Sequence, residues 1–339
     1  MVTLWTMSMT SVYADQHSAM LQQGDSIALF YGADALNQAY AVADSGAVIT
    51  LSKGDFTGLS IDKSITLIGY YGFSDQPAEG TVIAGDVTIT ANKVTVDGIR
   101  ITGTLILGDI SNCIIRHSGL NKFGASDNSK MHVNTILDQS YVKETILKSL
   151  CEKGKDLVIK NSTVRTQNSQ IDNPDNPVYF TNNVIYMLDG NYATTDYMLP
   201  YAVYVNNIIV YNGFSNGEGD GKSSVLSQRY PSTYINNGWC RGSYNSYNQT
   251  RSYGTTASVV DDVQIDLKNI LSGSDQTYNV PYPTYPNDPG LGSDGTPRGP
   301  LGGSGFTDRP SIPRIISREI GVNPDVEGKL NVKITVSAE

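Results

Sequence analysis

The chain has 339 residues and a mass of 36.6 kDa, with a formal net charge of −9 and a sequence pI of about 4.8. This acidic balance argues against binding to nucleic acid or to an anionic membrane surface, because both repel a negatively charged protein. No segment of the sequence is long and apolar enough to span a bilayer. The 33 glycines and 14 prolines are typical of many short strands separated by turns.

The first predicted features are a secretion signal and a capping helix. Residues 1–14 resemble the end of a secretory signal, with an apolar stretch over residues 4–12 and a small-residue cleavage site at Ala14. An N-terminal strand is the alternative. The alanine-rich segment from Ala33 to Ala43 has apolar residues at helical spacing, which predicts a short helix. We expect this helix to cover the open end of a strand stack that begins at Ala47, because a bare end would template aggregation.

An internal repeat occupies the middle of the chain. Each copy has an apolar run, a slot that holds Asn or Gly, and a second apolar run. Asn and Gly tolerate a left-handed backbone bend, so the slot predicts a strand that turns a corner once per coil. Stacking the copies predicts a parallel β-solenoid with Asn side chains bonded along the stack. The predicted corner residues are Gly98, Asn112, Asn134, Asn161, Asn182, Asn206 and Asn236.

One interval of this repeat is irregular. Only 14 residues separate Gly98 from Asn112, which is short for a full coil. Either that coil is unusually tight or one of the two residues belongs to another corner.

The same segments resemble a known superfamily. The capping-helix region, the string IDKSITLIGYYG (61–72) and the coils VYFTNNVIY and VYVNNIIVY look like right-handed parallel β-helix proteins of the pectin-lyase-like superfamily. The resemblance covers about Ala33 to Trp239, and the whole chain is similar to secreted proteins of Bacteroidetes bacteria. It implies an all-β, right-handed parallel β-helix. Because lyases, hydrolases, epimerases, adhesins and tailspikes share this fold, it implies no single activity.

The C-terminal third predicts a closing region and a hairpin. The string GSDGTPRGPLGG (292–303) resembles the Gly-rich coil that closes many bacterial members of the superfamily. Two alternating strands, Pro313–Val322 and Lys329–Ala338, predict an antiparallel hairpin that covers the last coil. We therefore expect a possible signal remnant over 1–14, a β-helix with its cap and a Tyr/Asn/Gly-rich closing region over 15–305, and a hairpin over 306–339.

One row of side chains follows the predicted corners by four residues. Strand alternation turns this row outward, and neighbouring coils lie about 4.8 Å apart, so its members would form a stripe. These members are Arg116, Asp138, Arg165 and Tyr186. The residues favour a solvated ladder in which Asp138 pairs with the flanking arginines. The alternative is a groove that binds an acidic or neutral sugar chain.

A second candidate site is a Gly-rich loop. The string NGEGDG places Glu218 and Asp220 close together, but it lacks the ligand number of a recognised calcium loop. A plain turn is therefore favoured over a Ca²⁺ site. No other cofactor is expected.

The sequence lacks the short motifs that mark the best-known enzymes of this superfamily. Pectate lyases carry WIDH and RxPxxR, and polygalacturonases carry NTD, a DD pair followed by GHG, and RIK; none of these occurs. We expect a secreted or cell-surface protein that is non-catalytic and either binds a glycan or has a structural role. A polysaccharide lyase or glycoside hydrolase with a non-standard active site is the alternative.

Overall fold

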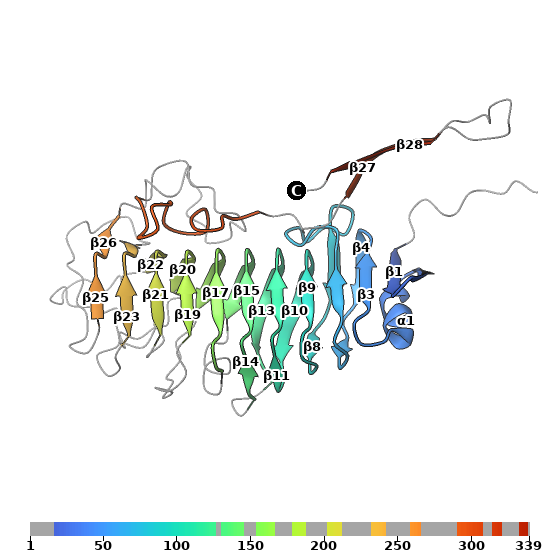
Figure 1. Cartoon of the computed structure of the whole chain (residues 1–339), viewed down its shortest axis with the longest axis horizontal. Helices are drawn as coiled ribbons and strands as arrows, with labels where there is room; N and C mark the ends of the chain where they lie inside the picture. Colours follow the sequence, from blue (N-terminus) through green and yellow to red (C-terminus); the bar gives the residue numbers. More distant parts are fainter. Residues whose placement is uncertain are drawn as a thin grey trace, which may run out of the picture.

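Short parallel strands stack into one elongated solenoid (Figure 1). The computed structural model describes residues 17–126, 130–145, 154–166, 178–187, 202–211, 232–241, 258–265, 290–307, 314–320 and 332–337. The predicted all-β parallel solenoid is confirmed, and the hand of its coil stays a prediction. Among these residues, no helix has the length and apolar character needed to cross a membrane. The predicted signal remnant, Glu218 and Asp220 lie outside the described residues.

The first sheet forms one long wall of the solenoid. It begins with an antiparallel β-hairpin and continues with parallel strands from β3 onward. Its strands in spatial order are β2 (Ser26–Tyr31), β1 (Ser18–Gln23), β3 (Val48–Leu51), β6 (Thr66–Ile68), β9 (Thr95–Asp97), β12 (Ile114–Arg116), β15 (Ile136–Asp138), β17 (Val158–Lys160), β19 (Tyr179–Thr181), β21 (Val203–Val205), β23 (Thr233–Ile235) and β25 (Ser258–Val260).

The second sheet forms the next wall, because from β10 onward each of its strands follows a first-sheet strand along the chain. Its strands are β4 (Gly54–Thr57), β7 (Thr81–Ala84), β10 (Arg100–Leu107), β13 (Gly119–Ala125), β16 (Tyr141–Thr145), β18 (Thr163–Thr166), β20 (Val184–Met187), β22 (Ile208–Tyr211), β24 (Gly238–Arg241) and β26 (Val263–Gln264). In addition, β8 (Val87–Ile89) pairs with β10, and β5 (Ser60–Ile61) pairs with β8. A short third sheet pairs β11 (Ile110–Ser111) with β14 (His132–Val133).

The corner between the first and second sheets is built from left-handed residues. From β9 onward, each first-sheet strand is followed by one such residue, at a φ between +45° and +70°. These residues, called the corner residues below, are Gly98, His117, Gln139, Asn161, Asn182, Asn206, Asn236 and Asp261. The left-handed bend predicted at the five Gly and Asn positions in this set is confirmed. His117 and Gln139 also have left-handed backbones, although their residue types did not predict this conformation.

Asn112 and Asn134 belong to a different corner, which corrects the predicted repeat. Both have left-handed backbones, but they lie ahead of the first sheet. Strand pairing places Ile115 beside Leu137 and Leu137 beside Ile159, so the residue in register with Asn161 is Gln139. The short interval after Gly98 therefore arises because two corners of the coil both use Asn.

Hydrogen bonds along the stack come from the residue after each corner residue. In these positions a side-chain oxygen accepts the backbone N–H of the equivalent residue one coil earlier, at 2.7–3.3 Å. This ladder consists of the buried residues Ser118, Ser140, Ser162, Asn183, Asn207 and Asn237, and it ends at the partly buried Asp262. The Asn ladder was predicted one residue too early. The corner residues supply the bend, and their neighbours supply the stacked bonds.

Inward side chains of the first sheet form a continuous apolar column. Small and branched residues fill its N-terminal half, and rings fill the C-terminal half. Phe180 stacks on Tyr204, and Tyr204 stacks on Tyr234, each with ring centroids 5.0 Å apart. Identical spacing in every coil lets flat rings stack along the axis, and such pairs add to the burial of their area.

Both predicted end elements are present. Helix α1 (Ala35–Val42) buries Ala35, Leu36 and Ala39 against the first coil, as predicted. Strands β27 (Arg314–Ile320) and β28 (Val332–Ser337) form the predicted antiparallel hairpin. Among the described strands they pair only with each other. Figure 1 draws this hairpin away from β25 and β26, so the capping role assigned to it stays a prediction.

Candidate functional site

A segment near the C-terminus runs back along the corner between the two long sheets. This segment, Gly290–Thr307, is called the strap below, and it contains the Gly-rich string predicted to close the last coil. Its contacts begin at Asn236 and end at Gln139, so it travels opposite to the direction in which coils are added. The strap therefore covers the outside of the corner over several coils (Figure 1).

Amide side chains of the corner residues hold the strap. Asn161 donates to the carbonyls of Pro300 and Gly302 at 3.0 and 2.6 Å. Asn206 accepts from the N–H of Ser293 at 2.8 Å. The left-handed bend turns these amides outward, where they satisfy backbone groups of the strap. Buried Arg298 adds bonds to the backbone and side-chain oxygens of Asn236.

The strap should loosen in acid because of Asp294. Burial raises the pKa of Asp294, but hydrogen bonds from Thr296 and Asn182 outweigh it and lower the pKa overall. A lowered folded-state pKa means that the carboxylate stabilises the strap above its ordinary pKa and that this contribution is lost as pH falls through the lowered value. We expect the hydrogen-exchange protection factors of the Gly299 and Gly303 amides to decrease when the pH is lowered below about 4.

Asp294→Asn is the matched control for this acid effect. It keeps the shape of the side chain and removes its titration. A protection profile that falls equally in the variant and in the native chain would assign the acid effect to other carboxylates.

Where the strap stops, a different segment covers the corner. Thr307 donates its N–H to the side-chain oxygen of Gln139 at 2.7 Å, and Phe306 packs against Phe73 with ring centroids 5.6 Å apart. Gly72, next to Phe73, forms a bridge with Ser118. A Cβ on Gly72 would lie 2.4 Å from the His117 carbonyl oxygen, so only glycine permits this approach.

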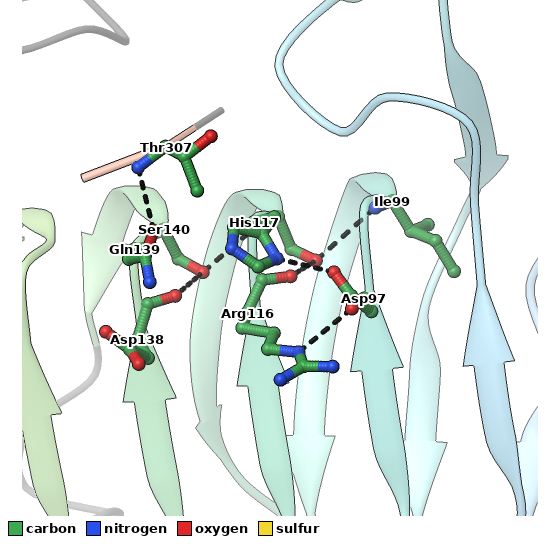
Figure 2. Close-up of polar contacts among 9 residues, drawn as sticks. Asp97, Ile99, Arg116, His117, Asp138, Gln139, Ser140 and Thr307 are labelled. Carbon is green, nitrogen blue, oxygen red and sulfur yellow. Dashed lines mark hydrogen bonds and ion pairs between the residues drawn. The ribbon is translucent and has the colours of Figure 1, made fainter. Parts of the chain in front are cut away.

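Beneath this cover lies a buried carboxylate with two basic partners. Asp97 ends β9 and is 1% exposed. One of its oxygens lies 2.6 Å from Nδ1 of the buried His117, and the other accepts a hydrogen bond of 2.9 Å from Nε of Arg116. Figure 2 shows both partners converging on Asp97 from the next coil. A carboxylate removed from water needs such partners, and here they fix Arg116 from behind.

Arg116 presents the rest of its guanidinium outward. Its side chain is 37% exposed on the outer face of the first sheet. Among the described residues its two terminal nitrogens make no hydrogen bond. A guanidinium anchored through Nε with both ends unbound is a planar donor pair suited to a carboxylate or sulfate.

The row continues on the next two coils. Asp138 pairs with Arg116 in register, and Lys160 pairs with Asp138. The Lys160 ammonium lies 3.2 Å from one oxygen of Asp138, while the other oxygen is buried and has no partner among the residues that the structure describes. The outer face therefore carries two cations, Arg116 and Lys160, on the coils either side of Asp138, whose side chain is only 14% exposed.

The structure divides the predicted stripe, which is a correction. Arg116 and Asp138 are neighbours in the first sheet, whereas Arg165 and Tyr186 are neighbours in the second. Tyr186 is also buried. The predicted row counted Asn112 and Asn134 as equivalent to Asn161, and their true equivalents lie five residues further along the chain. Whether any of the four residues binds a ligand stays a prediction.

Three residues of the observed cluster were missed by the sequence analysis: Asp97, His117 and Lys160. A signal existed for the last two. His117, Gln139 and Asn161 follow one another at intervals of 22 residues, and each is preceded by a charged residue. No pattern singled out Asp97 as the partner of Arg116 and His117, because that contact depends on how side chains of adjacent coils pack.

Two further searches bear on this site. The described part of the chain contains no group of three or more His, Cys, Asp or Glu side chains that could hold a metal ion. In comparison with known proteins, no protein-family model, curated protein or solved structure matches the chain.

Proposed function

We propose that this chain is a non-catalytic glycan-binding protein that uses the outer face of its first sheet. The observation that carries this proposal is the guanidinium of Arg116, which the buried Asp97 fixes through Nε and whose terminal nitrogens are unbound among the residues that the structure describes. Holding a donor pair in place before the ligand arrives reduces the entropy lost on binding. A sugar carboxylate or sulfate is the group that matches this fork.

The neighbouring coils support the same ligand class. Lys160 adds a second cation on the same face, two coils from Arg116, with Asp138 on the coil between them. Coils are spaced by about 4.8 Å, so the two cations lie roughly 10 Å apart along the axis. An acidic polysaccharide lying along the solenoid would meet Arg116 and Lys160 in turn.

The hydrolase alternative is less well supported at this cluster. A glycoside hydrolase requires two carboxyl groups about 5–10 Å apart that both reach the substrate. Asp97 is buried and engaged by Arg116 and His117, and Asp138 is only 14% exposed and pairs with Lys160, so this cluster does not present two carboxyl groups to a substrate. The resemblance to the pectin-lyase-like superfamily and to secreted Bacteroidetes proteins supports an extracellular setting, which is part of this proposal.

Arg116→Ala should weaken binding to an acidic polysaccharide. Hydrogen bonds to charged groups contribute about 1.5–3 kcal/mol, so we expect a loss of affinity of roughly tenfold or more. Affinity electrophoresis through gels containing polygalacturonate, chondroitin sulfate, alginate or neutral dextran measures this directly. Retention should also fall as salt is raised, because exposed ion pairs are screened.

Lys130→Ala is the matched control. Lys130 is similarly half-exposed and pairs with an aspartate, Asp109, away from the first sheet. This variant should bind like the native protein. Equal retention of Arg116→Ala and the native chain would exclude the outer face as the binding surface. In a separate absorbance assay, release of unsaturated uronate from the polysaccharide would favour the lyase alternative.

A further inference from the structure

The N-terminal edge of the first sheet is an uncharged apolar strand. Strand β2 contains Ser26, Ile27, Ala28, Leu29, Phe30 and Tyr31, and among the described strands it pairs only with β1. Ile27, Leu29 and Tyr31 are 64%, 55% and 52% exposed, on the same face of the strand. Protein edges usually carry charge, proline or a bulge that prevents further pairing, and β2 has none of these.

The backbone of β2 also offers hydrogen-bonding groups along this edge. Gly32 donates its N–H to the carbonyl of His17, and the register pairs Gln23 with Ser26 across the two-residue turn. In an antiparallel strand the N–H and C=O of one residue point to the same side, and the side alternates along the chain. Even-numbered residues of β2 therefore face β1, and Ile27, Leu29 and Tyr31 direct their backbone groups to the open edge.

This edge is complementary to itself. If two copies of β2 pair antiparallel about a two-fold axis at Leu29, Leu29 lies opposite Leu29 and Ile27 lies opposite Tyr31. This register pairs all three edge-facing residues, and it places Asp25 opposite Ala33, so like charges do not meet. It also creates two aromatic–β-branched cross-strand pairs, which are among the favourable ones.

From these observations we propose that the chain forms a symmetric dimer through β2, joining the first sheets of two copies into one continuous sheet. A self-complementary patch is what a two-fold interface requires, and two-fold dimers are the commonest oligomers. A two-fold axis perpendicular to the sheet keeps both outer faces on the same side. The two Arg116 clusters would therefore face one surface, which raises avidity for a multivalent ligand. The dimer itself does not depend on the proposed glycan binding.

Charge at the edge tests the proposal. Edge pairing buries less area than a standard interface, so the association should be concentration-dependent, and sedimentation equilibrium between roughly 1 and 500 µM covers its range. We expect the full chain to dimerise and Leu29→Lys to stay monomeric. Met131→Lys is the matched control, because Met131 is also 55% exposed but lies away from β2. A native chain that is monomeric throughout, or two lysine variants that behave alike, overturns the proposal.

Cysteine pairing tests the register. Directly opposed hydrogen-bonded residues have Cα atoms about 5.5 Å apart, within the range of a disulfide. Under mild oxidation Leu29→Cys should form a covalent dimer, and Ile27→Cys should crosslink to Tyr31→Cys only when the two variants are mixed. In a dimer of one variant, the two cysteines at position 27, or the two at position 31, would lie about 14 Å apart, too far for a disulfide. Crosslinking of Ile27→Cys with itself, or none at Leu29→Cys, contradicts the register and the dimer.

Discussion

Asn207→Ala should destabilise the protein by about 3–6 kcal/mol, the largest effect expected of a single polar residue in this chain. Its side-chain oxygen accepts from the backbone and amide of Asn183, and its amide donates to Phe180 and Asn237, all within buried surroundings. Truncation leaves several buried groups without partners, at about 1–3 kcal/mol each. Urea denaturation followed by far-UV circular dichroism measures the loss.

Asn134→Gly is the control for this prediction. Asn134 also has a left-handed backbone in its coil, but its side chain is exposed and donates a single bond, to Asn112. Glycine keeps the bend, so a change of about 0.5 kcal/mol or less is expected. If both variants unfold at the same urea concentration, the buried ladder does not have the stabilising role assigned to it.

Asp97→Ala should reduce both stability and glycan binding, although Asp97 is too deeply buried to touch a ligand. Removing one member of a buried ionic group leaves its partners uncompensated, which typically costs about 3–5 kcal/mol. Arg116 and His117 are the partners stranded here. Without its anchor, Arg116 loses the fixed orientation on which the proposed binding depends. Thermal unfolding and retention on an acidic polysaccharide should therefore both change.

Two further variants separate these effects. Asp97→Asn keeps the shape of the side chain and an acceptor for Arg116, so it should fold better than Asp97→Ala and recover part of the retention. Asp109→Ala removes an exposed aspartate paired with Lys130, and exposed pairs contribute about 1 kcal/mol or less. The anchoring role is wrong if Asp97→Ala folds less stably but binds the polysaccharide as tightly as the native chain.

Two different segments cover the outside of the corner: the strap and the segment around Gly72. Amide corner residues from Gln139 to Asn236 bind the strap, whereas His117 lies under the Gly72 segment and turns to Asp97. The outer corner is thus covered from His117 to Asn236, and the outer face of the first sheet lies beside it. This arrangement explains why the candidate binding residues lie on the sheet and not in the corner.

The class of fold can be predicted from residue types alone, because each coil repeats the same local conformational preferences. A left-handed residue between two apolar runs can be recognised from residue types alone, and the bend is present at each predicted Asn. The capping helix followed from apolar spacing in the same way, since Ala35, Leu36 and Ala39 are its buried residues. These features depend on conformational preferences of a few neighbouring residues.

Only the tertiary structure decided which coils align and what their side chains meet. Asn is favoured at both corners, so residue type could not separate Asn112 and Asn134 from Asn161; the pairing of Leu137 with Ile159 does. That register moves Arg116 and Asp138 away from Arg165 and Tyr186 and brings Asp97 and His117 beside Arg116. Contacts between coils, and between the strap and corner residues more than a hundred positions earlier, depend on packing that no local preference encodes.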